Sequence, residues 1–209
     1  MKLLEEQYPE MKPFVCKKYE KGGKHSLLVI GESHYLPNGN IQHLDPQIWY
    51  AGNSKTLDEK SRGWICTSDI IQEVREMPNH RPYAIYKNGL MQINKLGPQY
   101  DNFTDVLDDI VYYNFFLRPA LQGDSLKVAE LDVKYANEHF VEILKEYDPK
   151  GIVFLSSKAA QFCQELSVIS IPVAKAPHPG CRWWNKKCAK YGNRYGRDVV
   201  ADAVSKMWA

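Results

Sequence analysis

The segment SLLVIGESHY, residues 26–35, decides the fold of this 209-residue chain. Its first part is almost entirely apolar and ends at Gly31, which is typical of a strand buried on both faces of a parallel sheet. A glycine here lets the backbone turn sharply or approach a ligand closely. The polar and aromatic side chains that follow are of types common in catalytic and binding sites: Glu32, Ser33, His34 and Tyr35. The segment therefore predicts a buried strand that leads into a functional loop.

Three more apolar runs predict strands, at residues 110–114, 151–155 and 171–175. Helical patterns accompany them, at residues 133–147, 157–166 and 197–208. This βαβ alternation predicts an α/β fold of three layers, α/β/α, with a four-stranded parallel sheet in the strand order 2-1-3-4. Helices are also predicted between the first two strands, near residues 68–76, 82–96 and 103–108. We expect these inserted helices to build a wall of the site.

Composition favours one domain over residues 1–209, because 44% of the residues are hydrophobic and no low-complexity linker divides the chain. No segment has the roughly 20 consecutive apolar residues that span a bilayer, and no secretory signal is recognisable. We therefore expect a cytoplasmic protein that does not bind membranes and is a monomer. The five cysteines form no CxxC pair, so we expect reduced thiols, no metal site and no cofactor.

Polar residues follow each predicted strand, and in an open parallel sheet ligands bind beyond the carboxyl ends of the strands. Asn114 ends the second predicted strand, and its amide offers both a donor and an acceptor, the pattern needed to read the edge of a pyrimidine-like ring. We expect a neighbouring aromatic, Phe115 or Phe116, to stack on the face of that ring. His178 follows the last strand between Pro177 and Pro179, which stiffen the loop and hold the imidazole at the site.

Basic and aromatic residues alternate just after His178. Residues 175–197 contain seven Lys or Arg and no acidic residue. We expect a DNA-contacting loop here that neutralises phosphates and carries an apolar wedge able to enter a base stack. Its members would be Pro179, Gly180, Arg182, Trp183, Trp184, Lys186 and Lys187.

In order and spacing, these signals resemble the uracil-DNA glycosylase superfamily, from about residue 26 to the C-terminus. The matching elements are the loop at Gly31–Tyr35, the strand end at Asn114, the strand-turn-helix unit at residues 149–160 and the sequence His178-Pro179-Gly180. The resemblance implies a DNA repair enzyme that flips a damaged or deaminated base and hydrolyses its N-glycosidic bond. It implies that Asn114 reads the base and that His178 donates a hydrogen bond to the departing base.

The catalytic part of the resemblance rests on Glu32, Ser33 and His178, and two positions depart from the family. Ser33 stands where the most efficient members have the Asp that positions the attacking water, with Glu32 one residue earlier. Gly180 stands where the family has Ser. By the same resemblance, Gly31, His34 and Tyr35 would help to shape the base pocket. The sequence leaves open which base is excised and whether the nucleic acid is single- or double-stranded DNA, RNA or a nucleoside.

Two other functions fit the same residues. In an esterase of the Gly-Asp-Ser type, Ser33 would be the nucleophile and His178 the base, although Lys175 stands where that family has the Asp that orients the histidine. Alternatively, the chain is a nucleic-acid-binding module without catalytic activity on the same fold.

Overall fold

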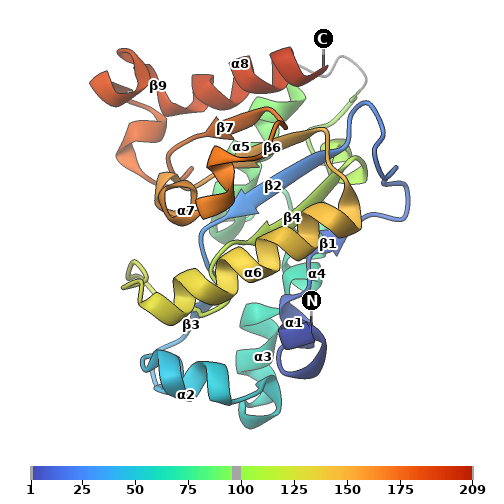
Figure 1. Ribbon diagram of the computed structural model, residues 1–209. Coiled ribbons are helices and arrows are strands. Elements are labelled where there is room, and N and C mark those ends of the chain that lie inside the picture. The colour runs from blue at the N-terminus through green and yellow to red at the C-terminus, as the bar shows by residue number, and fades with distance from the viewer. Residues whose placement is uncertain (1, 96–99, 209) are drawn as a thin grey trace.

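A mixed β-sheet forms the centre of the fold (Figure 1). The computed structural model describes residues 2–95 and 100–208. Within this part of the chain, the sheet order is β1 (Phe14–Val15), β4 (Ile110–Asn114), β2 (Leu27–Gly31), β6 (Gly151–Phe154) and β7 (Val173–Lys175). The β1–β4 pair is antiparallel and the other neighbours are parallel. The prediction of four strands is thus wrong by one, because the two residues of β1 are too few to show a pattern.

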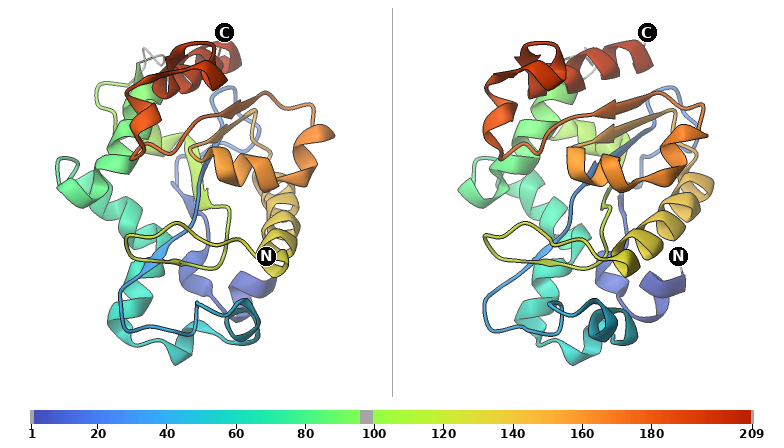
Figure 2. Two further views of the ribbon diagram at one scale, coloured as in Figure 1. Left: turned by 90° about the vertical axis from the view of Figure 1, so that its left-hand side faces the viewer. Right: turned by 60° about the vertical axis from the view of Figure 1, so that its left-hand side comes forward.

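Successive residues of each strand face opposite sides of the sheet, so two cores form. On one side, strand residues such as Val29 and Val153 pack against α4 (Thr67–Glu76), α5 (Ala84–Asn94) and α8 (Gly196–Trp208). On the other side, Ile30 and Ile152 pack against α6 (Glu130–Tyr147) and α7 (Ser157–Phe162). Figure 2 shows α4 and α5 on one side of the sheet and α6 on the other. The molecule is therefore an α/β structure whose mostly parallel sheet is covered by helices on both faces.

A third apolar cluster lies beyond the carboxyl edge of the sheet. It contains Leu4, Trp49, Ile65 and Leu117, and joins α1 (Lys2–Glu6), α2 (Pro46–Ala51) and α3 (Glu59–Ile65). Small two-stranded sheets pair β3 (Tyr35–Leu36) with β5 (Ala120–Leu121), and β8 (Lys187–Cys188) with β9 (Arg194–Tyr195). Short 3-10 helices complete the described chain: Pro9–Met11, Ser54–Thr56, Arg81–Tyr83, Asp105–Asp108, Gln164–Ser167, Arg182–Trp184 and Ala189–Tyr191.

The helix predictions differ from the structure mainly at helix ends. Helix α6 begins at Glu130, because the Asp132 carboxylate accepts a hydrogen bond from the Ala129 amide in the first turn. The predicted helix at 103–108 is only a 3-10 turn, and the one at 157–166 ends at Phe162 before a second 3-10 turn. The predicted helix over residues 82–96 begins at Ala84, and its last predicted residue lies outside the described residues.

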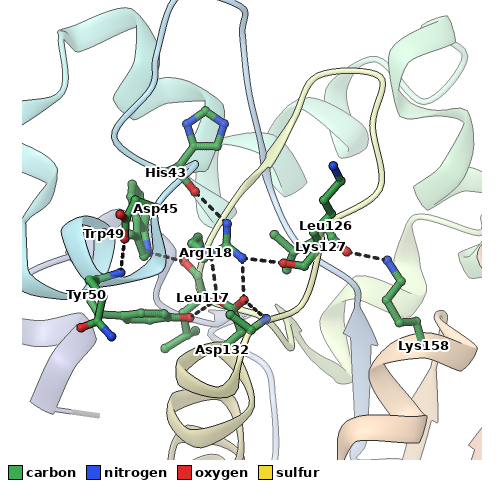
Figure 3. Close-up of polar contacts among 12 residues, drawn as sticks. His43, Asp45, Trp49, Tyr50, Leu117, Arg118, Leu126, Lys127, Asp132 and Lys158 are labelled. Atoms are coloured by element: carbon green, nitrogen blue, oxygen red, sulfur yellow. Dashed lines mark hydrogen bonds and ion pairs between the residues drawn. The ribbon is translucent and has the colours of Figure 1, made fainter.

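A buried ion pair ties the chain after β4 to helix α6 (Figure 3). Arg118 Nε donates to Asp132 Oδ1 at 2.8 Å, and Nη2 donates to Oδ2 at 2.6 Å. The two side chains are 6% and 0% exposed. The guanidinium also donates to the carbonyl oxygens of His43 and Lys127. One arginine therefore fixes three segments that surround the carboxyl edge of the sheet.

No helix among residues 2–95 and 100–208 is long and apolar enough to cross a membrane.

Candidate functional site

A cavity of about 570 Å³ opens at the carboxyl edge of the sheet, a volume in the range of small-molecule sites. Four strand ends contribute to it: the loop after β2, Asn114 of β4, Leu155 after β6, and His178 after β7. The inserted helices form the facing wall, with side chains that include Trp64, Ile70, Glu73, Tyr83, Ile85 and Tyr86. Residues far apart in the sequence, Gly31, Asn114 and His178 among them, therefore line one cavity.

Asn114 lies across the backbone of Gly31. A Cβ atom at Gly31 would collide with Asn114 Oδ1 and with the Tyr112 hydroxyl, so only glycine fits at the end of β2. The Asn114 side chain is buried, and its Oδ1 accepts a hydrogen bond from Tyr112 Oη at 3.4 Å. Its Nδ2 has no hydrogen-bond partner within the described part of the chain. A buried donor without a partner in a cavity wall is suited to bind a ligand oxygen.

His178 is held in one ring orientation. Its Nδ1 accepts a hydrogen bond from the backbone N–H of Gly180 at 3.1 Å. The neutral imidazole must therefore carry its proton on Nε2, which makes Nε2 a donor. Burial lowers the pKa of His178, while the nearby charges of Glu32 and Lys158 raise and lower it respectively. A side chain at Gly180 would crowd this arrangement, because its Cβ would lie 3.2 Å from Nδ1.

Glu32 points toward the start of α7. Its Oε2 accepts from Ser156 Oγ at 2.7 Å and its Oε1 accepts from Lys158 Nζ at 2.9 Å. Ser156 is also the N-cap of α7, since its Oγ accepts from the Ala159 amide. Glu32 and Lys158 are 17% and 29% exposed, so this ion pair is mostly shielded from water. The carboxylate therefore has a fixed place beside the cavity.

The other residues of the first loop have different surroundings. His34 lines the cavity but is buried, and its Nε2 lies 3.0 Å from Thr67 Oγ1 of α4. Burial lowers the pKa of His34 to about 4, so this ring is neutral at physiological pH. Ser33 and Tyr35 are half-buried in the cavity wall. Burial also raises the pKa of Tyr35, which keeps its phenol protonated.

The aromatic wall of the cavity consists of tyrosines and not of the predicted Phe115 or Phe116. The rings of Tyr83 and Tyr86 meet edge-on at 6.5 Å, and those of Tyr86 and Tyr112 at 5.5 Å. This row runs from Glu73, which accepts a hydrogen bond from Tyr83, to the Tyr112–Asn114 pair. Tyr112 could have been found from the sequence, because it lies two residues before Asn114 on the same strand face.

The predicted stacking role of Phe115 and Phe116 is wrong. Both rings are fully buried in the core under α6 and α7, packed on each other and near Phe140 and Phe162 respectively. The chain stays extended beyond Asn114, since the Phe115 amide bonds to the Gly31 carbonyl. The Phe116 amide likewise bonds to that of Glu32. Neither ring lines the described cavity.

The predicted DNA-contacting loop is only partly exposed. Trp184 is 2% exposed and belongs to the core beneath α8, so it is not an apolar wedge. Trp183 is 36% exposed, and Arg182 stacks on its ring with 4.0 Å from Cζ to the centroid. Pro179 is buried and lines the cavity, so it is not part of the exposed surface. Exposed positions are Gly180, Arg182, Trp183, Lys186 and Lys187.

Comparison of the chain with protein-family models and with curated proteins gives no match in either case. Within the described residues, no group of three or more His, Cys, Asp or Glu side chains could hold a metal ion.

Proposed function

We propose that this chain is a DNA glycosylase that binds a flipped base in the cavity and hydrolyses its N-glycosidic bond. The observation that carries the proposal is the pairing of two donors in one aromatic-walled cavity. Asn114 Nδ2 has no protein partner, and His178 Nε2 is the protonated nitrogen of a neutral imidazole. A flipped base is read in this way, by hydrogen bonds to its edge and by packing between aromatic side chains.

Two donors favour a base with carbonyl oxygens at both positions read. Tyr112 Oη donates to the oxygen of the Asn114 amide, whereas the N–H groups of that amide have no partner within the described part of the chain and are free for a carbonyl oxygen of the base. We infer that His178 donates to the carbonyl oxygen on which negative charge grows as the glycosidic bond breaks. The deaminated bases uracil and xanthine carry two such oxygens. Glu32 would take the place of the family's Asp: its carboxylate would stabilise the sugar cation and take up the proton that the attacking water loses.

Excision is tested with oligonucleotides that contain uracil, hypoxanthine, xanthine or an oxidised pyrimidine, by cleavage of the resulting abasic sites. We expect the wild-type chain to excise at least one of these bases. We expect Ser33→Ala to retain the rate within about tenfold, because a glycosylase does not use this hydroxyl as a nucleophile.

The outcomes of this assay separate the three candidate functions. Binding of DNA without release of any base would favour the silent binding module. Labelling of Ser33 by a fluorophosphonate, with aryl-ester hydrolysis that Ser33→Ala abolishes, would favour the esterase. The ring orientation of His178 disfavours that outcome, because a triad histidine donates from Nδ1 to a carboxylate, whereas here Nδ1 accepts from Gly180.

The exposed basic residues after His178 make DNA affinity dependent on salt. Replacing Arg182, Lys186 and Lys187 by alanine is expected to reduce the slope of log K against log salt by about two to three, since each phosphate contact releases counterions. Fluorescence anisotropy at several salt concentrations measures this slope. The control variant has alanine in place of Lys17, Lys21 and Lys24. It loses the same charge, but these residues precede β2 and lie at the opposite edge of the sheet. A slope that changes equally in both triple variants would contradict the assignment.

A further inference from the structure

Lys158 pairs with Glu32, a carboxylate that lines the same cavity as His178. Its Nζ donates to Glu32 Oε1 at 2.9 Å and to the Leu126 carbonyl at 3.0 Å, and it also contacts Ser125 Oγ. Figure 3 shows the side chain reaching from α7 to the Leu126 carbonyl. An ammonium group has three protons, and here there is an acceptor for each. These three contacts therefore fix the position of the Lys158 ammonium group.

The Glu32 carboxylate is held just as firmly. Ser156 and Lys158 each donate to a different oxygen, at 2.7 and 2.9 Å, and Ser125 Oγ lies 3.4 Å from Oε1. Together these donors fix the orientation of the carboxylate group. Glu32 is thus suited to act by its charge and its fixed position.

An isolated carboxylate next to His178 would conflict with the neutral imidazole. A nearby negative charge favours the imidazolium. Protonation of Nδ1 would also place two N–H groups face to face, because the Gly180 amide donates to that nitrogen at 3.1 Å. The charges of Glu32 and Lys158 have opposite effects on the pKa of His178, and the other charged side chains that line the cavity are Lys60, Asp69 and Glu73.

We propose that Lys158 is a positioning residue that fixes Glu32 as an anion beside the cavity and offsets its charge at His178, so that the imidazole stays a neutral donor. The site can then hold an anion, which favours a positively charged sugar, close to a neutral group that donates to the departing base. The consequence for excision rests on the proposed function. The consequence for the ionisation of His178 does not.

The ionisation of His178 is measured by NMR on histidine-labelled protein, with its resonance assigned by loss in His178→Ala. We expect Lys158→Met to raise the pKa of His178, Glu32→Gln to lower it, and Lys158→Arg to restore the wild-type titration. Lys150→Met is the matched control, since Lys150 pairs with Asp148 at 3.2 Å ahead of β6, at the other edge of the sheet. An unchanged titration in both Lys158→Met and Glu32→Gln would overturn the proposal.

The second measurement is the rate of base excision. Lys158→Met is expected to lower the single-turnover rate about a hundredfold, as a misplacement of about 1 Å does, with unchanged DNA affinity and with partial rescue by Lys158→Arg. A loss of affinity at an unchanged rate would contradict a positioning role. If the wild-type chain excises no base, the proposed function fails, while the His178 titration still decides the role of Lys158.

Discussion

Replacing His178 by alanine is expected to slow base excision by roughly a hundredfold to a thousandfold, or about 2.7–4 kcal/mol, as for other single donors aimed at developing charge. DNA affinity should stay nearly the same, because in the proposed function His178 contacts the flipped base and not the phosphates. The geometry behind this expectation is the hydrogen bond from the Gly180 amide to Nδ1 at 3.1 Å, which leaves the proton of the neutral ring on Nε2. Single-turnover kinetics and a binding titration measure the two quantities separately.

The control for this variant is His178→Gln, whose side-chain amide can still donate a hydrogen bond. We expect it to keep more activity than the alanine variant. Equal losses of rate and of DNA affinity in His178→Ala would contradict a role confined to the base.

The pKa of His178 also leads to a prediction for the dependence of the excision rate on pH. Burial lowers the pKa of His178 below its ordinary value of about 6.5, so the neutral form persists to lower pH than in a free histidine. The rate should therefore hold as pH falls to about 6.5 and decrease only below it.

The sequence alone predicts the strands correctly where a local pattern of residues determines the structure. The apolar run at residues 27–31 forms a strand, and Asn114 ends the neighbouring strand. Both strand ends lie at the carboxyl edge of the sheet, as predicted, because parallel strands end at a common edge. Gly31 is required for a reason that the sequence did not show: the side chains of Asn114 and Tyr112 approach its backbone so closely that no Cβ fits there.

The errors arise where tertiary packing decides. The sequence shows aromatic residues after Asn114 and after Arg182, but it does not show on which side of the backbone they lie. Phe115 and Phe116 continue the extended chain into the core, and Trp184 lies under α8. Lys158 was not predicted to touch the site, because its partner Glu32 lies far away in the chain and only the fold brings them together.

The largest expected effect on stability is that of Asp132→Ala. This change leaves the Arg118 guanidinium buried without its counter-ion, which typically costs about 3–5 kcal/mol. It also removes the acceptor for Tyr50 Oη at 3.0 Å and for the Ala129 amide at the start of α6. For a chain of this length, where each kcal/mol lowers Tm by roughly 2–4 °C, we expect a decrease of at least about 6 °C.

Asp202→Ala is the matched control, because it makes the same truncation in an ion pair with Arg194 whose side chains are 52% and 44% exposed. Exposed pairs contribute little, so this variant should unfold almost like the wild type. Calorimetric scans measure the Tm of both variants. The Arg118–Asp132 pair fixes the segments that carry Lys127 and Leu126, the latter a partner of Lys158, so loss of Asp132 should also lower excision below the melting transition. Similar Tm values for the two variants would mean that the buried pair does not hold these segments together.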